Sequence, residues 1–264
     1  YIQRLYIYME NSNQLIINII GTQEFFWRSM ATDVYHKNGL FGWTTELKAD
    51  YLNGVINTGA NVTLENVKEV IDFFKTHDVS WLWILNPIYD AKSTIKLLLS
   101  QGFKEAGSYP VMWYDLTRDL PELDLKQAYI REVLDEKGLM EWRIPEDEGF
   151  KVDKNEQSGY FDRVENVPFG GAEAFHHYVV YKDEKPISCA TLSISKYGAR
   201  IDNVATCDDF LRQGFGRAVT IFAMREAQKF GCKMVCLESS NEGLSLYLKI
   251  GFKEIYQNKE YCLL

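Results

Sequence analysis

The sequence lacks any apolar run long enough to cross a bilayer, and its start lacks a signal-peptide pattern. A membrane-spanning helix needs about 18 consecutive apolar residues, and no stretch of the 264 residues approaches that length. A secretory signal needs a charged segment, a short apolar segment and a cleavage site. These absences predict a cytoplasmic, soluble protein that works without a membrane.

Positive charge and paired cysteines are also scarce. The formal net charge is −8, which argues against nucleic acid as the main partner, because duplex binding depends on neutralising phosphates. No Cys-x-x-Cys pair occurs, and no histidine follows the cysteines to complete a metal site. We therefore expect no metal and no disulfide framework. The expected state is reduced, buried thiols at Cys189, Cys207, Cys232, Cys236 and Cys262.

The sequence does contain a strand-like segment that runs into two glycines and then into an amphipathic helix, over Ile201–Arg217. The first amides of a helix have no partners within it, and the helix dipole adds positive potential there. Gly214 and Gly216 let the backbone approach a ligand closely, and Arg212 and Arg217 add two cations. This combination is suited to hold a phosphate or pyrophosphate. A Gly-x-Gly alone is equally compatible with a tight turn that binds nothing.

The same segment resembles the acyl-CoA-binding motif of the GNAT superfamily of N-acetyltransferases, whose pattern is Arg/Gln-x-x-Gly-x-Gly/Ala after a strand. Gly214-x-Gly216 and the preceding Asn203–Thr206 fit this pattern, whereas Leu211 stands where the family has arginine or glutamine. The resemblance is specific over residues 187–252. It implies that acetyl-CoA binds here as the acyl donor, without a metal.

The resemblance also implies which residues bind this cofactor. In the family, the strand before the glycines splays from its neighbour, and its free backbone groups pair with the pantetheine arm as an added strand would. Asn241 resembles an asparagine that contacts this arm in relatives, although Ser240 occupies the commonest position and Asn241 is equally suited to cap the next helix. The implied residues are Val204, Ala205, Thr206, Arg212, Gln213, Gly214, Phe215, Gly216, Arg217 and Asn241.

Acyl transfer also needs a proton for the departing thiolate and a base for the amine. Tyr247 lies four residues before Gly251, in a Leu-Tyr-x-x-x-Gly-Phe run that resembles the family's. A phenol with a pKa of about 10 can protonate a thiolate, but a tyrosine packed beside apolar neighbours is the alternative. As base we expect Asp202 or Glu238, which are equally compatible with solvated carboxylates at strand ends. Structural roles are expected for Glu173, His176 and His177.

The two halves of the chain share a short repeat. Gly-Phe-Lys-Glu occurs at 102–105 and again at 251–254, and each copy follows a predicted helix, strand and helix in that order. A duplicated unit explains both observations. We therefore predict an α/β (α+β) fold of two tandem GNAT-like domains, 1–120 and 121–264. Each is expected to be a mixed, mostly antiparallel sheet flanked by helices.

Apolar periodicity predicts the individual elements, since strands alternate every second residue and helices repeat every three to four. The predicted strands are Leu15–Ile20, Gly54–Asn57, Ser80–Leu85, Val111–Tyr114, Gln127–Val133, Ala174–Tyr181, Ile187–Ser195, Arg200–Thr206 and Lys233–Glu238. The predicted helices are Glu24–Val34, Val62–His77, Ala91–Gln101, Lys137–Phe150, Glu156–Val167, Arg217–Phe230 and Glu242–Ile250.

The first domain lacks the features that would bind the cofactor. Val62–Asn66 takes the place of Leu211–Arg217 and has neither a glycine pair nor an arginine, and Glu65 would repel a pyrophosphate. We expect this domain to be a degenerate copy that keeps the fold. Its aromatic residues, including five of the six tryptophans, are expected to pack in its core. The alternative is that they form one wall of a substrate cleft.

The sequence thus predicts an acyltransferase that moves an acetyl group from acetyl-CoA to a primary amine by direct attack in a ternary complex. A non-catalytic acyl-CoA-binding regulatory module is the alternative, favoured by Leu211 and by the lack of an obvious base. A purely structural scaffold is the third reading. The sequence determines neither the acceptor, a small-molecule or peptide amine, nor the oligomeric state.

Overall fold

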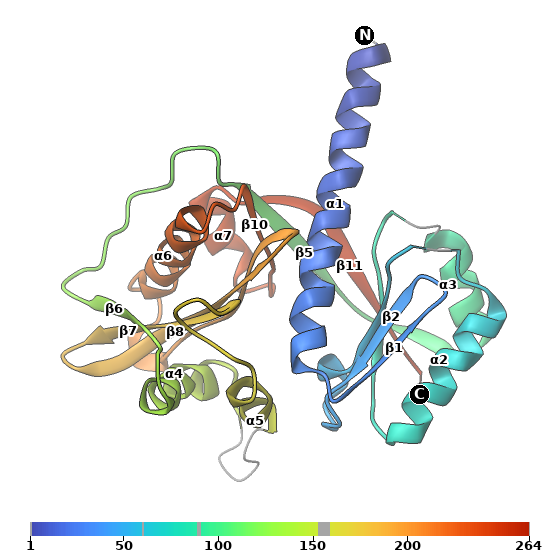
Figure 1. Ribbon diagram of the computed structural model, residues 1–264, viewed down its shortest axis with the longest axis horizontal. Coiled ribbons are helices and arrows are strands. Elements are labelled where there is room, and N and C mark those ends of the chain that lie inside the picture. The colour runs from blue at the N-terminus through green and yellow to red at the C-terminus, as the bar shows by residue number, and fades with distance from the viewer. Residues whose placement is uncertain (1, 60, 89–90, 153–158, 264) are drawn as a thin grey trace. The chain divides into compact units, whose positions relative to one another are not determined.

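The computed structural model describes residues 2–59, 61–88, 91–152 and 159–263, and Figure 1 shows the path of the chain. The chain forms two compact units, one of Tyr1–Val111 with Ile255–Leu264 and the other of Met112–Glu254. This division differs from the predicted boundary after residue 120, and it returns the end of the chain to the first unit. The last strand joins the first unit because it pairs with distant segments, and no local sequence pattern predicts that pairing.

The first unit is a mixed sheet with helices on both faces. Strands β1, β2 and β3 are antiparallel, β3 and β4 are parallel, and β4 is antiparallel to β11, which neighbours β5. Its elements are α1 (Ile2–Met30), β1 (Asp33–Lys37), β2 (Leu40–Thr44), the 3₁₀ turn η1 (Asp50–Leu52), β3 (Gly54–Asn57), α2 (Leu64–His77), β4 (Leu82–Leu85), α3 (Ala91–Ser100), β5 (Phe103–Asp115) and β11 (Lys253–Leu263).

The second unit repeats this plan. Strands β6, β7, β8 and β9 are antiparallel, β9 and β10 are parallel, and β10 neighbours β5. Its elements are β6 (Tyr129–Glu132), α4 (Glu136–Gly149), α5 (Gly159–Glu165), β7 (Phe175–Lys182), β8 (Lys185–Ser195), β9 (Gly198–Thr206), the 3₁₀ turn η2 (Asp208–Phe210), α6 (Phe215–Lys229), β10 (Met234–Glu238) and α7 (Leu244–Ile250).

The order of elements is the same in the two units. The segment β1-β2-β3-α2-β4-α3-β5 corresponds to β7-β8-β9-α6-β10-α7-β11, and in both the third and fourth strands pair in parallel. The predicted fold class, a mixed α/β sheet flanked by helices, is confirmed. The strands that close the two repeats each enter both units, because β5 belongs to the second unit from Met112 and β11 to the first from Ile255.

The N-terminal segment was predicted incorrectly. Leu15–Ile20 is not a strand but part of the 29-residue helix α1, and the helix predicted over Glu24–Val34 ends at Met30. A short run of β-branched residues is compatible with either structure. Burial of Ile19, Ile20, Phe26 and Met30 gives the helix an apolar face. Among the described residues, no helix has the length and apolar character needed to span a membrane.

Helices cover both faces of the first sheet because neighbouring strand residues point in opposite directions. Val55 and Trp83 pack with α2 and α3, whereas Ile56 and Ile84 pack with Ile20 of α1. Most of the tryptophans are part of this packing, as expected: Trp43, Trp81 and Trp83 are buried. Stacked rings join the layers, with centroids 4.2 Å apart in one pair and 5.1 Å in another, Phe74–Trp81 and Trp27–Trp43.

The packing around Gly54 in this sheet leaves no room for a side chain. A Cβ atom added there would lie 2.9 Å from Trp43 Cζ2 and 3.1 Å from the backbone oxygen of Leu82. Because a backbone atom cannot give way easily, Gly54→Ala should destabilise the protein by about 1–3 kcal/mol, seen as a lower urea midpoint. The control is Gly59→Ala, where the nearest atom is 3.9 Å away, and its midpoint should match wild type. Equal midpoints for the two variants would contradict this account.

Candidate functional site

Strand β9 contains an irregularity at its centre. Its register against β8 shifts between Asp202 and Ala205, so that Asn203 and Val204 oppose the single residue Ala190. Asn203 adopts a left-handed backbone conformation with φ 51°. This is a β-bulge, which bends a strand and redirects the side chains that follow.

Beyond the bulge, one edge of β9 has no neighbouring strand. Over the described length of both strands, β9 pairs with β10 only at Ala199 and Arg200, although β9 continues to Thr206. Val204 and Ala205 therefore lie on a strand whose β10 side is open. An extended ligand can add to such an edge through main-chain hydrogen bonds.

Helix α6 begins shortly after this edge, and its first amides are unpaired. Gly214 precedes the helix with φ 95°, no side chain caps the helix start, and the first hydrogen bond runs from Ala218 N to Gly214 O at 2.9 Å. Within the described residues, the amides of Phe215, Gly216 and Arg217 have no acceptor. Free amides combined with the helix dipole favour an anion at this position.

The corresponding helix of the first unit begins differently. Thr63 Oγ1 accepts a hydrogen bond from Asn66 N at 3.2 Å, and Asn66 Oδ1 accepts one from Thr63 N at 3.1 Å. This capping box satisfies the amide of Asn66, whose counterpart in α6 is the free amide of Arg217. The first turn of α2 also carries Glu65, so its start does not favour an anion.

Three cations lie at the start of α6. Lys126 Nζ donates to the carbonyl of Gln213 at 2.7 Å, and Arg217 Nη1 donates to the carbonyl of Glu122 at 3.1 Å. Arg212 is exposed and adopts a left-handed conformation with φ 59°. The sequence indicated both arginines, but Lys126 stands 87 residues before Gln213 in a segment without a motif, and only the fold brings it here.

Tyr247, predicted as the acid, lies on α7 with only 8% of its surface exposed. Its ring makes an edge contact with Phe252, at 5.8 Å between centroids. Burial raises the pKa of Tyr247, and the negative charge of Asp202 raises it further. The phenol is therefore protonated at neutral pH, and Tyr247 lies within electrostatic reach of the predicted base.

The two predicted bases are associated with one buried arginine. Arg200 Nε donates to both carboxylate oxygens of Asp202 at 3.0 Å, and the charge of Glu238 also acts on Arg200. Burial raises the pKa of Asp202, although Arg200 opposes that change. Sequence reasoning did not include Arg200, yet residues two apart on a strand share a face, and this spacing could have indicated the pair.

Residues 173–254 match the family model described as an acetyltransferase (GNAT) domain. This range contains the bulge, the start of α6 and Tyr247. The second unit carries a GNAT acetyltransferase domain. No curated protein sequence matches the chain significantly.

Solved structures with the same fold extend over both units. A GCN5-related N-acetyltransferase from Kribbella flavida has a TM-score of 0.73 at 14% identity, covering 94% of this chain and 95% of its own. One from Sphaerobacter thermophilus has a TM-score of 0.58 at 12% identity, covering 85% and 76%. A tandem GNAT protein from the clavulanic acid biosynthesis pathway has a TM-score of 0.54 at 8% identity, covering 75% and 68%. These likenesses show a shared fold.

In the GNAT domain, α7 begins after Gly243, and no side chain caps it. Ser240 Oγ accepts a hydrogen bond from Gly243 N at 3.1 Å, while Asn241 is exposed. The alternative role of Asn241 as a cap of this helix is therefore wrong. Asn241 remains a predicted ligand contact.

Other polar residues of the GNAT domain have structural environments. His176 Nδ1 lies 2.7 Å from Glu132 Oε1, and His177 Nδ1 lies 2.9 Å from Thr191 Oγ1. Both histidines are buried, whereas Glu173 is exposed. The cysteines are present as free thiols. Burial and the charge of Glu148 raise the pKa of one of them, Cys207, to about 12, so it is not a thiolate at neutral pH.

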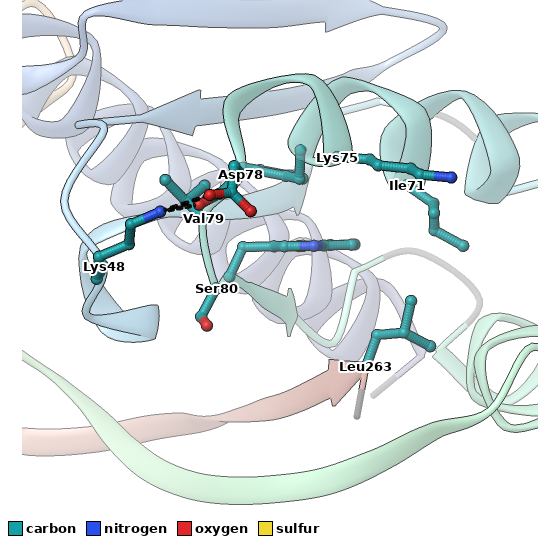
Figure 2. Close-up of a pocket in the computed structure, with 9 residues that line it drawn as sticks. Lys48, Ile71, Lys75, Asp78, Val79, Ser80 and Leu263 are labelled. Carbon is teal, nitrogen blue, oxygen red and sulfur yellow. Dashed lines mark hydrogen bonds and ion pairs between the residues drawn. The ribbon is translucent and has the colours of Figure 1, made fainter.

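A separate pocket of about 460 Å³ lies in the first unit. Figure 2 shows Lys48 reaching Asp78 at its rim, with an Nζ–Oδ2 distance of 2.9 Å. This ion pair neutralises both charges, and none of the predicted catalytic or cofactor-binding residues lines the pocket. The lining residues are Lys48, Ile71, Phe74, Lys75, Asp78, Val79, Ser80, Trp81 and Leu263.

His177 predicts a pH dependence of stability. Burial lowers the pKa of His177 to about 3, whereas an unfolded histidine titrates near 6.5. Below about pH 6.5 the unfolded chain binds the extra proton, so stability should fall as pH falls, by at most about 1.4 kcal/mol per pH unit. Urea midpoints between about pH 5 and 7 test this, and His177→Gln should show a smaller slope. If the urea midpoints of wild type and His177→Gln changed equally with pH, His177 would not contribute to the pH dependence of stability.

Proposed function

We propose that this protein is an N-acetyltransferase that moves an acetyl group from acetyl-CoA to a primary amine by direct attack in a ternary complex. The observation that carries the proposal is the start of α6, where three successive amides lack acceptors and no side chain caps the helix. The match of residues 173–254 to an acetyltransferase domain supports the same reading.

The residues at this helix start fit a pyrophosphate. Gly214 has φ 95°, a conformation that a side chain would strain, and a Cβ atom there would lie 3.6 Å from Lys126 Nζ. We propose that the amides of residues 213–217 bind the diphosphate oxygens, with Lys126, Arg212 and Arg217 adding positive charge. Gln213 and Phe215 contribute through their backbone.

The open edge of β9 and Asn241 are proposed to hold the pantetheine arm. Val204, Ala205 and Thr206 would pair with its amides as an added strand does. The thioester carbonyl of acetyl-CoA would then lie at this edge. The side chains around it would supply and accept the protons of the reaction.

Tyr247 is proposed as the acid. Its raised pKa keeps the phenol protonated at neutral pH, so it can donate a proton to the departing thiolate. Asp202 and Glu238 stay candidates for the base. Both carboxylates interact with Arg200, so they are also suited to position the acceptor in the site.

The first unit is proposed to be a degenerate copy that does not bind the cofactor. Its helix α2 has a complete capping box and carries Glu65 in its first turn. Its buried tryptophans support a role in packing.

Gly214→Glu should abolish CoA binding, because the side chain would occupy the anion position and repel phosphate. The matched control is Gly231→Glu at the other end of α6. Gly231 also has a left-handed backbone, with φ 82°, and a Cβ atom there would meet nothing within 4 Å. Calorimetry with CoA should show binding for the control and none for Gly214→Glu. If Gly214→Glu bound CoA with wild-type affinity, the diphosphate would not bind at this position.

Tyr247→Phe should leave CoA binding nearly unchanged and lower kcat by about 10²–10⁴-fold, the usual contribution of a general acid. Thiol release over a panel of primary amines measures this. Tyr197→Phe, in the turn between β8 and β9, is the control and should behave as wild type. Unchanged turnover in Tyr247→Phe would exclude it as the acid.

A further inference from the structure

Glu146 on α4 is a buried carboxyl group with no role in the reaction described above. The residue is 4% exposed, and its Oε2 atom has no hydrogen-bond partner in the described part of the chain. Leaving a buried acceptor unpaired costs about 1–3 kcal/mol. Such a group in a folded protein therefore points to a partner that arrives from outside.

Glu146 lies on the face of α4 that covers the sheet. Trp142, one turn earlier, has its ring centroid 5.0 Å from that of His177 on β7. Gly149, about one turn later, packs so closely that an added Cβ atom would lie 2.7 Å from the Cβ atom of Ala205. Because residues three and four apart share a helix face, Glu146 lies between these contacts and faces the sheet near the bulge.

The effect of the Glu146 charge on neighbouring groups agrees with this location. Asn203 Nδ2 at the bulge donates to the hydroxyl of Tyr160 at 3.0 Å. The charges of Glu146 and Asp202 both raise the pKa of that tyrosine, and Glu146 also acts on Cys189 of β8. The carboxyl group of Glu146 is therefore close to the point where β9 opens.

The surrounding charges distinguish Glu146 from the other carboxylates. Asp202 is paired with Arg200, and Asp147 accepts from Arg143 Nε at 2.8 Å. No ion pair joins Glu146 to a described cation. Burial raises the pKa of Glu146 to about 7. The charge of Asp147 and a hydrogen bond with it add to the rise, and the charge of Arg143 opposes it. A base with a pKa near the working pH is the most effective one.

We propose that Glu146 receives the ammonium group of the acceptor and removes its proton, so that a neutral primary amine meets the open edge of β9. This inference rests on the proposed function and names the base within it. The acceptor class is then an aliphatic primary amine that is cationic in solution. An ammonium ion supplies the hydrogen-bond donors that Oε2 lacks.

The protons balance. The ammonium gives one proton to Glu146, and the amine nitrogen forms a bond to the acyl carbon as the carbon–sulfur bond breaks. Tyr247 donates its proton to the thiolate and regains one from the nitrogen through solvent. Glu146 releases its proton to water, and the products are an amide, a thiol and one proton.

The test compares Glu146→Gln with Glu148→Gln in the full-length protein. Both variants replace one carboxylate of α4 by an amide, but Glu148 is exposed. It accepts from Asp208 N at 2.7 Å and interacts with the thiol of Cys207, and glutamine can keep the bond to Asp208. Glu146→Gln should lower kcat by about 10²–10⁴-fold with aliphatic mono- and diamines, while CoA affinity measured by calorimetry stays at the wild-type value. Glu148→Gln should match wild type in both measurements.

The pH profile separates catalysis from a structural role. Wild-type kcat/KM should fall below a pKa of about 7, as the base becomes protonated, and this acidic limb should vanish in Glu146→Gln. Glu146→Asp keeps the negative charge, so it should keep the acidic limb of the pH profile with a lower kcat. This variant tests the proposal if Glu146→Gln fails to fold. If Glu146→Gln kept the wild-type kcat and the acidic limb of the pH profile, this inference would be wrong and the proposed function would be unaffected. A wild-type protein that binds CoA but acetylates no amine would overturn the proposed function with it.

Discussion

Main-chain amides without acceptors at the start of α6 are the constraint on which the site depends. They arise because Gly214 turns the chain into the helix with a positive φ and supplies no capping side chain. Water satisfies such groups when they are exposed, but an anion does so more favourably because the helix dipole adds to the attraction. Every other feature of the site is placed relative to this point: the strand before the helix, the cations around it and the tyrosine on the following helix.

The two units share one topology but differ at the start of the helix that follows their third strand. Both place a helix after three antiparallel strands and before a parallel one. In the first unit, Thr63 and Asn66 satisfy part of the helix start from within, and Glu65 places a negative charge in the first turn. In the second, the same position is left open, and the bulge at Asn203 turns the preceding strand away from its neighbour. In the proposed function, binding depends on a few residues at a helix start, while the fold depends on apolar patterning elsewhere.

The strand-to-helix segment could be read from sequence because its signal is local. Glycine spacing, arginines and a preceding strand all fall within Ile201–Arg217, and the apolar periodicity of most elements in both units was equally clear. The first helix was not readable in this way, because Leu15–Ile20 is short and β-branched and only burial of Ile19 and Phe26 reveals its helical face. Lys126 and Glu146 carry no local signal, since Lys126 contacts Gln213 and α4 packs on β9 only through the fold.

The sequence alone determined the repeat, the fold class and the glycine turn before α6, because each depends on residues that are neighbours along the chain. Only the tertiary structure decided which side chains surround that turn, that the chain's last strand belongs to the first unit, and that Arg200 holds Asp202. The physical reason is that pairing, burial and charge environment are properties of positions in space. Folding removes water from a carboxyl group such as Glu146, and this burial is the main reason that its pKa rises to about 7.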